Sequence, residues 1–293
     1  MDNIRIVLDN IMPIGLFIGL ATLDFIYLTP SIPQPNQKIV AIDALTAAGG
    51  PATNAAMTFQ WLGNHSRLLS AIGKHPSSQF IRSDLANLEL FDLLPDRLES
   101  PPISSILVTQ STGDRAVISV NATEFQVDQF PLKILDGVDV VLIDGHQMVV
   151  SAAIAALAKA HGIPVVIDCG SWKPGFETVL AYADYAICST NFLPPNCEQS
   201  NEVFEFLNGF KIPFVAITQG ANMILYCDHN RSGTVSVPIV KIVDTLGAGD
   251  VFHGAFCHFI LHQDFPTALS NSAKVAARSC QSFGTRSWFS ALD

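Results

Sequence analysis

The sequence predicts an α/β fold, in which helices cover both faces of a doubly wound, mostly parallel sheet and a small antiparallel β lid is attached. Short apolar runs of strand length alternate with longer segments of helical pattern along most of the chain. Two of these runs, at 138–144 and 163–168, are almost continuous in apolar residues, which is typical of parallel strands buried on both faces. A pair of β runs, at 105–110 and 116–120, interrupts the alternation and predicts a hairpin.

The strands and helices of this fold can be placed in order along the chain. The apolar runs predict strands at 16–20, 67–72, 138–144, 163–168, 185–189 and 214–218. The segments between them predict helices at about 51–62, 77–89, 148–160, 174–182, 199–209, 247–262 and 266–281. The alanine-rich helix 148–160 has a clear end, because His161-Gly162 follows it. Repeated strand–helix–strand units of this kind form a doubly wound sheet.

Two segments near the N-terminal half do not follow the alternation. Residues 38–47 have the pattern of an extended strand with no helix before the next strand-like stretch, and a glycine-containing loop at 111–115 joins the two hairpin strands. We therefore expect one domain over residues 1–293, with lid segments at about 25–48 and 102–122 inserted in it. Lids of this kind close over a substrate. An exposed lid sheet also offers edge strands through which a homodimer could form.

The composition excludes several classes of protein. The chain has 293 residues, of which 49% are hydrophobic and 14% charged, so it will fold rather than stay disordered. Sixteen Lys and Arg against 26 Asp and Glu give a net charge of -10, which argues against a nucleic-acid partner. The apolar run 11–21 is shorter than the roughly 20 residues of a membrane span, so we interpret it as a buried strand and expect no membrane partner. The six cysteines form no C-x-x-C pair and predict reduced thiols in a cytoplasmic protein.

The most informative motif is Asp-Thr-Leu-Gly-Ala-Gly-Asp at 244–250, between a predicted strand at 234–242 and the helix 247–262. Gly247 and Gly249 allow a tight turn with outward amides at a helix N-terminus, where anions bind. With Asp250 at its edge, such a pocket suits phosphoryl transfer, because the amides stabilise the transferred charge and the carboxylate accepts a hydroxyl proton. Glycine-rich turns before helices are common, however, so the motif also fits a plain helix N-cap.

Two further motifs lie near the N-terminus. Gly49-Gly50 leads into a helix with Pro51 in its first turn, and Asn54 follows one turn later. Asn54 fits either a ligand contact or an ordinary exposed helix position. Asp24 follows the first predicted strand, and ligands of open α/β sheets bind outside the carboxyl ends of strands. It could accept hydrogen bonds from sugar hydroxyls or be a solvated loop residue.

Residues 244–250 resemble the C-terminal signature of the ribokinase-like carbohydrate kinases, the phosphofructokinase-B family, and Gly49-Gly50 with Asn54 resembles the N-terminal signature. Both occur in the right order and at about the right separation, and with the hairpin the resemblance covers essentially the whole chain. Pro51-Ala52-Thr53 replaces the ribokinase form of the N-terminal signature, which makes the chain look nearer to ketohexokinase-like and sulfofructose-kinase-like members. The resemblance implies an ATP-dependent sugar kinase that phosphorylates a primary hydroxyl of a small ketose or pentose, with Mg²⁺ and a monovalent cation such as K⁺.

The resemblance also implies roles for individual residues. The catalytic group comprises the base and the amides of the anion hole, which are Asp250, Gly247, Ala248 and Gly249. The expected sugar contacts are Asp24, Gly50, Asn54 and Asp250. The expected nucleotide contacts are Asn191, Thr218, Gly220, Gly247, Gly249 and Asn271. Asp168 would help to arrange the hydrated Mg²⁺, and the carbonyls of Asp244 and Leu246 would contribute to the monovalent-cation site.

The chain departs from the family at one position that bears on metal binding. Many members carry Asn-x-x-Glu, whereas Asn191 is followed here by Pro194 where the carboxylate belongs. Two alternatives therefore stay open, a non-catalytic sugar- or nucleotide-binding regulator on the same fold and a nucleoside kinase. An aromatic stacking group, for which Phe25, Tyr27 and Phe125 are candidates, would favour the nucleoside kinase.

A group of histidines and a cysteine at 253–262 could be mistaken for a second metal site. Helical geometry puts His253 and Cys257 on one face and His258 and His262 on another, so they cannot all bind one ion. The pattern favours a structural helix.

Overall fold

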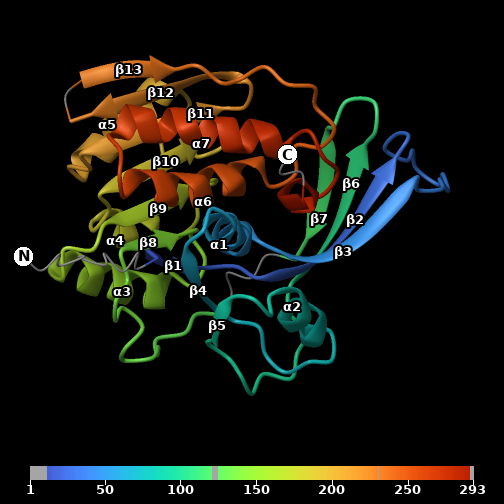
Figure 1. The fold of residues 1–293 in the computed structure, drawn as a ribbon, viewed down its shortest axis with the longest axis horizontal. Coiled ribbons are helices and arrows are strands. Elements are labelled where there is room, and N and C mark those ends of the chain that lie inside the picture. Colours follow the sequence, from blue (N-terminus) through green and yellow to red (C-terminus); the bar gives the residue numbers. More distant parts are fainter. Residues whose placement is uncertain (1–11, 121–124, 230, 291–293) are drawn as a thin grey trace, which may run out of the picture.

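The computed structural model describes residues 12–120, 125–229 and 231–290. Its main sheet has nine strands (Figure 1). In spatial order they are β13 (Arg231–Val235), β12 (Asn222–Asp228), β11 (Phe214–Gln219), β10 (Tyr185–Ser189), β9 (Val165–Cys169), β8 (Val140–Ile143), β1 (Ile14–Ile18), β4 (His65–Ser70) and β5 (Glu89–Asp92). All pairings from β11 to β5 are parallel, and only the β11–β12 and β12–β13 pairings are antiparallel. This confirms the predicted α/β fold with a mostly parallel sheet.

Helices cover the main sheet on both faces (Figure 1). One layer contains α1 (Pro51–Trp61), α2 (Ser78–Asp84), α6 (Ala248–Ile260) and α7 (Phe265–Ser279), and the short 3-10 helix η1 (Ser287–Ser290) packs beside it. The other layer contains α3 (Met148–Ala160), α4 (Phe176–Leu180) and α5 (Ser200–Gly209). In β1, Phe17 packs into the first layer while Leu16 and Ile18 pack into the second. Both faces of each strand are therefore apolar, which is why the strand runs look continuous in sequence.

The lid is a separate four-stranded sheet beside the carboxyl ends of the main strands, drawn in blue and green in Figure 1. Its order is β3 (Asp43–Gly49), β2 (Thr22–Thr29), β6 (Ile103–Thr109) and β7 (Arg115–Ser119). The β2–β3 and β6–β7 pairings are antiparallel, as expected, and the central β2–β6 pairing is parallel. These strands lie close to the predicted lid segments 25–48 and 102–122, of which residues 121 and 122 are outside the described part of the chain.

Three predicted elements differ most in extent. The strand expected at 38–47 begins only at Asp43. The strand expected at 234–242 ends at Val235, and residues 236–242 have no regular structure. Pro238 lies in this stretch and cannot donate a hydrogen bond to a sheet. The helix expected at 77–89 ends at Asp84, because the following apolar residues form the edge strand β5. The apolar run that was predicted to begin at Ile11 starts outside the described residues, and β1 occupies its centre.

The chain changes direction across the sheet at β1. From β1 it continues through the lid and α1 to β4 on one side, and it later returns to β8 on the other side of β1. Ligands of doubly wound folds bind outside the carboxyl ends of strands at such a reversal. A ligand site is therefore expected beyond Ile18 and Ile143, where β1 and β8 end. No helix within the described residues is long and apolar enough to cross a membrane.

Candidate active site

The two sequence signatures meet at the ends of two helices. Asp250 lies in the first turn of α6, and Asn54 lies in the first turn of α1. Asn54 Nδ2 donates a hydrogen bond of 2.8 Å to Asp250 Oδ2, across 196 positions of sequence. The Asn54 side chain is buried, and no described residue donates a hydrogen bond to its Oδ1. The contact brings Asn54 and Asp250, two of the predicted site residues, to one place.

Glycines bring the two helix N-termini close to this pair. Gly50 has φ 101°, and a Cβ there would collide with the Leu20 carbonyl oxygen. Gly247 has φ 71°, and a Cβ there would lie 3.0 Å from Thr285 Cγ2 and 3.5 Å from Asn54 Nδ2. L side chains rarely adopt such angles, so both positions require glycine. The positive ends of α1 and α6 therefore converge on the same place, which favours an anion.

The turn before α6 has free amides, as the anion-hole prediction requires. Among the described residues, none accepts a hydrogen bond from the backbone N–H of Gly247 or Gly249. The N–H of Ala248 reaches the Thr245 carbonyl at 3.3 Å, so it is already engaged. Two of the three predicted amides are thus available to a ligand oxygen.

Electrostatics give Asp250 the character of a base. Burial raises its pKa from 3.8 to about 7, and the negative charge of Asp168 acts in the same direction. The hydrogen bond from Asn54 and the neighbouring His253 oppose this rise in pKa. A general base works best when its pKa lies near the working pH. Asp250 meets that condition at neutral pH.

Asp168 lies behind Asp250, near the carboxyl end of β9. Its side chain is buried, and burial raises its pKa although His253 acts in the opposite direction. His253 Nε2 is 3.5 Å from Asp168 Oδ1 and 3.2 Å from the Ile187 carbonyl oxygen. His253 Nδ1 is 2.7 Å from the Gly249 carbonyl oxygen. His253 therefore links the first turn of α6 to the sheet, a role that the sequence did not reveal.

Asp24 lies in β2 on the lid face that turns toward the core. Its Oδ1 accepts a hydrogen bond of 2.6 Å from Thr22 Oγ1. Burial raises the pKa of Asp24, while hydrogen bonds from Thr22 and Ser104 act against the rise. A Cβ at Gly49 would collide with the Asp24 carboxylate, so the first glycine of the N-terminal signature makes room for it. Asp24 is thereby held beside the start of α1.

Asp144, which the sequence analysis did not select, ties three parts of the site together. Its Oδ2 accepts hydrogen bonds from the backbone N–H groups of Leu20, at 2.8 Å, and Ala52, at 3.0 Å. Its Oδ1 accepts from the backbone N–H and Nδ1 of His146, at 2.9 and 3.0 Å. Burial acts to raise the pKa of Asp144, but His146, the backbone N–H of Leu20 and the charge of Lys173 outweigh it and lower the pKa to about 2. The available signal was its place directly after the apolar run at 138–143.

The lid reaches the turn before α6 through Arg115, which was also missed. Arg115 Nη1 donates to the carbonyl oxygen and to Oγ1 of Thr245, both at 3.0 Å. Thr245 Oγ1 in turn donates to the Gly113 carbonyl oxygen at 3.1 Å. The hairpin loop of the lid is therefore hydrogen-bonded to the catalytic signature. An arginine in the predicted hairpin loop was visible in sequence, but its partner lies 130 positions away.

The predicted nucleotide contacts lie in two places. Thr218 lies near the carboxyl end of β11, and its Oγ1 donates a hydrogen bond of 3.1 Å to the Cys188 carbonyl oxygen. Asn191 follows β10 and is exposed. Gly220 follows with φ 60°. Asn271 lies in α7, where its side chain donates to Gln263 Oε1 at 2.9 Å and accepts from Lys274 Nζ at 2.9 Å, and its nucleotide contact stays a prediction.

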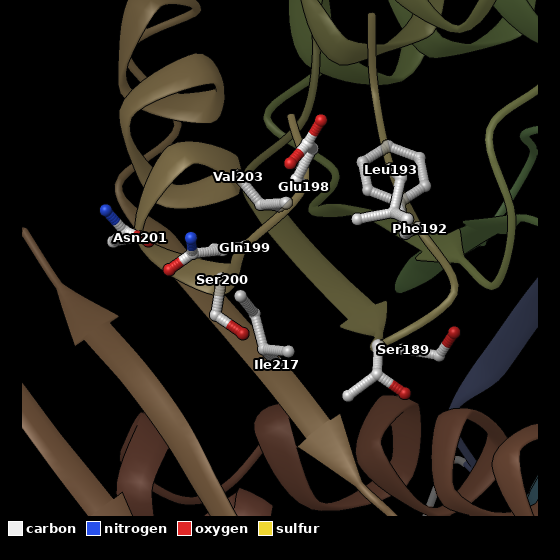
Figure 2. Close-up of a pocket in the computed structure, with 10 residues that line it drawn as sticks. Ser189, Phe192, Leu193, Glu198, Gln199, Ser200, Asn201, Val203 and Ile217 are labelled. Carbon is white, nitrogen blue, oxygen red and sulfur yellow. The ribbon is translucent and has the colours of Figure 1, made fainter. Parts of the chain in front are cut away.

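A pocket of about 450 Å³ adjoins Asn191 and Thr218. Figure 2 shows that its lining comes from Ser189 at the end of β10, Ile217 in β11, and Glu198 and Ser200 at the start of α5. It lies outside the carboxyl ends of two parallel strands, where ligands of such sheets bind.

The groups suited to cations are few. Asp244 is buried, and its carboxylate accepts hydrogen bonds from the N–H groups of Leu246, at 2.8 Å, and Gly284, at 2.9 Å. The carbonyl oxygens of Asp244 and Leu246 receive no hydrogen bond from any described residue, so they are available to a monovalent cation. Over the described ranges there is no cluster of three or more His, Cys, Asp or Glu side chains that could hold a metal ion. Asp168 is a carboxylate close enough for its charge to raise the pKa of Asp250.

Comparisons with known proteins identify the class to which this fold and site belong. The family model for pfkB family carbohydrate kinases matches residues 16–291, so the chain belongs to that family of phosphotransferases. The ribokinase of Lactococcus lactis is 25% identical over 92% of this chain and 91% of its own length. The fructosamine kinase of Bacillus subtilis is 25% identical over 80% of this chain and 84% of its own length.

Solved structures support the same fold. The structure of Arabidopsis thaliana ribokinase complexed with ribose and ATP superimposes with a TM-score of 0.76, covering 96% of this chain and 99% of that chain at 19% identity. The predicted resemblance to the phosphofructokinase-B family is thus confirmed. The particular nearness to ketohexokinase-like and sulfofructose-kinase-like members stays a prediction.

Proposed function

We propose that this carbohydrate kinase transfers the γ-phosphoryl group of ATP to a primary hydroxyl of a small sugar, with Asp250 as the base. The observation that carries the proposal is the 2.8 Å contact of Asn54 with Asp250 at the converging N-termini of α1 and α6. Asp250 has a pKa of about 7 and so is partly ionised at neutral pH. It accepts the hydroxyl proton as the oxygen attacks the γ-phosphorus in line.

The sugar is held by side chains from the lid and from α1. Asn54 Oδ1 is a buried acceptor without a partner among the described residues, and a sugar hydroxyl would remove the cost of leaving it unpaired. Asp24 and the backbone at Gly50 supply the other contacts. Relatives named ribokinase and deoxyribokinase favour a pentose. A ketose substrate stays open, since a fructosamine kinase is also among the relatives.

The phosphates lie at the start of α6. The free amides of Gly247 and Gly249 stabilise the charge on the transferred group. Arg115 brings a guanidinium to the same turn through Thr245, so lid position and catalysis are coupled. The rest of the nucleotide extends toward Asn191, Thr218 and Gly220. Asn271 would have to release Gln263 to join them.

Cations complete the proposed site. Mg²⁺ prefers few carboxylates, several waters and substrate phosphates, and we assign this role to Asp168. When bound, Mg²⁺ neutralises charge on the phosphates. K⁺ would take the free carbonyls of Asp244 and Leu246, which lie in the turn before the anion hole. Pro194 replaces the carboxylate that many members use, so Mg²⁺ binding rests more heavily on Asp168.

The open face of the lid favours a homodimer. Strand register puts Phe25 and Ile118 in one row and Tyr27 and Leu107 in the next, on the face opposite the buried Ile26. Ile118 is 75% exposed, although it lies in the middle of a strand pair with an apolar face. We propose that this face packs on a second copy. An Ile118→Lys variant should then elute as a monomer in size-exclusion chromatography, and an unchanged elution volume would refute the interface.

The experiment that tests the proposed function is ADP release from Mg·ATP over a panel of sugars. The panel holds ribose, fructose, 2-keto-3-deoxygluconate, sulfofructose, phosphorylated ketohexoses and adenosine. Asp250→Asn should remove nearly all turnover and leave sugar binding largely intact, while Asp136→Asn, at an exposed carboxylate, should change neither. Turnover that survives in Asp250→Asn contradicts the mechanism. Sugar and ATP binding without any turnover would favour the regulator, and turnover of adenosine alone would favour a nucleoside kinase.

A further inference from the structure

The lid joins the core at Ala48, near the end of β3. β3 is an edge strand of the lid sheet, and it leads through Gly49 and Gly50 directly into α1. Ala48 is fully buried, so its backbone N–H and carbonyl oxygen both need partners. The N–H donates a hydrogen bond of 2.7 Å to Asp84 Oδ2, and the carbonyl oxygen accepts one from Arg286 Nη2. Two side chains from outside the lid therefore hold the junction between lid and core.

These two side chains also form an ion pair with each other. Arg286 Nη1 donates to Asp84 Oδ2, the same oxygen that accepts the Ala48 N–H. The Arg286 side chain is 15% exposed and the Asp84 side chain 37%, so solvent screens the pair less than it screens a pair on the open surface. Asp84 is the last residue of α2, and Arg286 precedes η1. The Asp84–Arg286 pair thus fixes Ala48 from two different parts of the core.

The arginine of this pair lies in a C-terminal segment, residues 283–289, that is anchored to the rest of the site. The Gly284 N–H donates a hydrogen bond of 2.9 Å to Asp244 Oδ2, at the start of the catalytic signature. Trp288 is 1% exposed, and its ring centre lies 4.5 Å from that of Trp61 in α1. In Figure 1 this segment is dark red and lies between α1 and the lid. The guanidinium is therefore held at a fixed place beside the lid.

The Asp84–Arg286 pair also lies close to Asp24, a proposed sugar contact. A Cβ at Gly49 would lie 1.8 Å from Asp24 Oδ2, so this carboxylate rests against the turn that follows the held residue. Burial raises the pKa of Asp24, while hydrogen bonds from Thr22 and Ser104 and the charge of Arg286 oppose the rise. The pair can therefore act on Asp24 through the backbone and through charge.

We propose that Asp84 and Arg286 are positioning residues of the sugar site, which hold the lid junction at Ala48 and thereby the Asp24 carboxylate and the Gly50 backbone. The inference rests on the proposed sugar kinase function and adds two residues that belong to neither sequence signature. A junction that is already held in place loses less conformational entropy when the lid closes on a sugar. The nucleotide contacts proposed at β11 and α6 do not pass through Ala48, so the pair should affect the sugar alone.

The first test measures the junction without any ligand, by amide hydrogen exchange. Asp84→Ala removes the acceptor of the Ala48 N–H, and exchange at Ala48 should become about tenfold or more faster. Exchange at Phe59, in the middle of α1, should not change. Asp136→Ala, at an exposed carboxylate, is the matched control and should behave as the wild type at both amides. Unchanged exchange at Ala48 in Asp84→Ala would overturn the proposal.

The second test separates the two substrates. Calorimetry gives the affinity for ribose, fructose and Mg·ATP, and ADP release gives each KM and kcat. Arg286→Met should raise Kd and KM for the sugar about tenfold and leave kcat and the values for Mg·ATP within about twofold. Arg286→Lys keeps the charge and should recover part of the loss. Arg231→Met, at an exposed arginine in β13, should match the wild type.

A double variant shows whether the pair acts as a unit. Asp84→Ala combined with Arg286→Met should weaken sugar binding no more than either change alone, because each already breaks the same pair. Thermal unfolding of every variant shows whether the fold is retained. Equal losses for sugar and for Mg·ATP, or a lower Tm with unchanged sugar binding, would indicate a purely structural role and overturn the proposal.

The positioning role and the kinase mechanism fail in different ways. Sugar binding that depends on Asp84 and Arg286, without any ADP release, would support the positioning role and contradict the kinase mechanism. ADP release with the same sugar KM in wild type, Asp84→Ala and Arg286→Met would support the kinase mechanism and contradict the positioning role.

Discussion

Replacing Asp250 with asparagine should make the protein more stable while it removes activity. In the folded chain the Asp250 carboxylate is partly removed from solvent and lies near the charge of Asp168, and both effects disfavour its ionised form. Asparagine has nearly the same shape and no charge, and its amide oxygen can still accept the hydrogen bond from Asn54 Nδ2. The variant is therefore relieved of an unfavourable charge without losing the contact that joins α1 to α6.

The size of the gain follows from the pKa. The pKa of Asp250 rises from 3.8 to about 7 on folding, and each unit corresponds to about 1.4 kcal/mol. The upper bound is then ~4 kcal/mol above pH 7. Solvent reaches part of the Asp250 side chain, so screening should reduce the gain in the free energy of unfolding to about 1–2 kcal/mol.

The sign of the pH dependence follows from proton linkage. Below pH 4 the carboxyl is protonated in both the folded and the unfolded wild type, so the variant has no advantage. Between pH 4 and 7 the unfolded wild type loses its proton first, and wild-type stability falls as pH rises. The advantage of Asp250→Asn should thus grow from pH 4 to 7 and stay constant above.

Thermal and urea unfolding at pH 5 and pH 8 measure this effect, with Asp136→Asn as control. We expect a rise in Tm of about 2–6 °C for Asp250→Asn at pH 8, a smaller rise at pH 5, and no change for the control. A variant less stable than wild type at pH 8, or a gain in stability that is independent of pH, would refute the argument that the folded state disfavours the ionised form of Asp250.

Three further predictions follow from single contacts. Asp24→Ala should raise the sugar KM more than tenfold and leave the ATP KM within about twofold, and equal effects in steady-state kinetics would place Asp24 elsewhere. Arg115→Met should lower kcat about tenfold with an unchanged Tm, because the side chain is exposed and, among the described residues, its hydrogen bonds go to Thr245; an unchanged kcat would contradict it. Asp144→Ala should lower the free energy of unfolding by about 3 kcal/mol or more, because it leaves buried donors unpaired, and a stability within 1 kcal/mol of wild type in urea would show that these contacts are replaceable.

Most of the fold could be predicted from the sequence because the patterns that mark strands and helices are local. A buried parallel strand must be apolar on both faces, as at 138–143, and the helix predicted at 148–160 agrees with α3. The β12–β13 hairpin had no continuous apolar run to mark it, because few residues of β12, which extends from Asn222 to Asp228, are buried. The parallel β2–β6 pairing joins two strands that are far apart in sequence, and no local sequence pattern predicts it.

The sequence pointed to those site residues whose motif requires glycine at a backbone angle that other residues rarely adopt. It did not point to residues whose role depends on a contact with a residue remote in sequence. Gly50 and Gly247 stood out because only glycine fits their angles and close approaches. Arg115 and His253 could not be found in this way, since their significance depends on Thr245 and Asp168, which are remote in sequence. Asp144 was the exception, because an aspartate directly after a buried strand resembles Asp168, which was selected.

Three of the aspartates at this site, Asp144, Asp168 and Asp250, differ in the number of hydrogen bonds that they accept. Asp144 accepts four hydrogen bonds, and its pKa falls to about 2. The ionised carboxylate therefore holds the loops after β1 and β8 in place. Asp250 accepts one and Asp168 has only a 3.5 Å contact with His253, and burial raises the pKa of both. In the proposed function, a proton from the substrate would balance the charge of Asp250, and a cation would balance the charge of Asp168. The opposite expected effects of Asp144→Ala and Asp250→Asn on stability are the consequence of that difference.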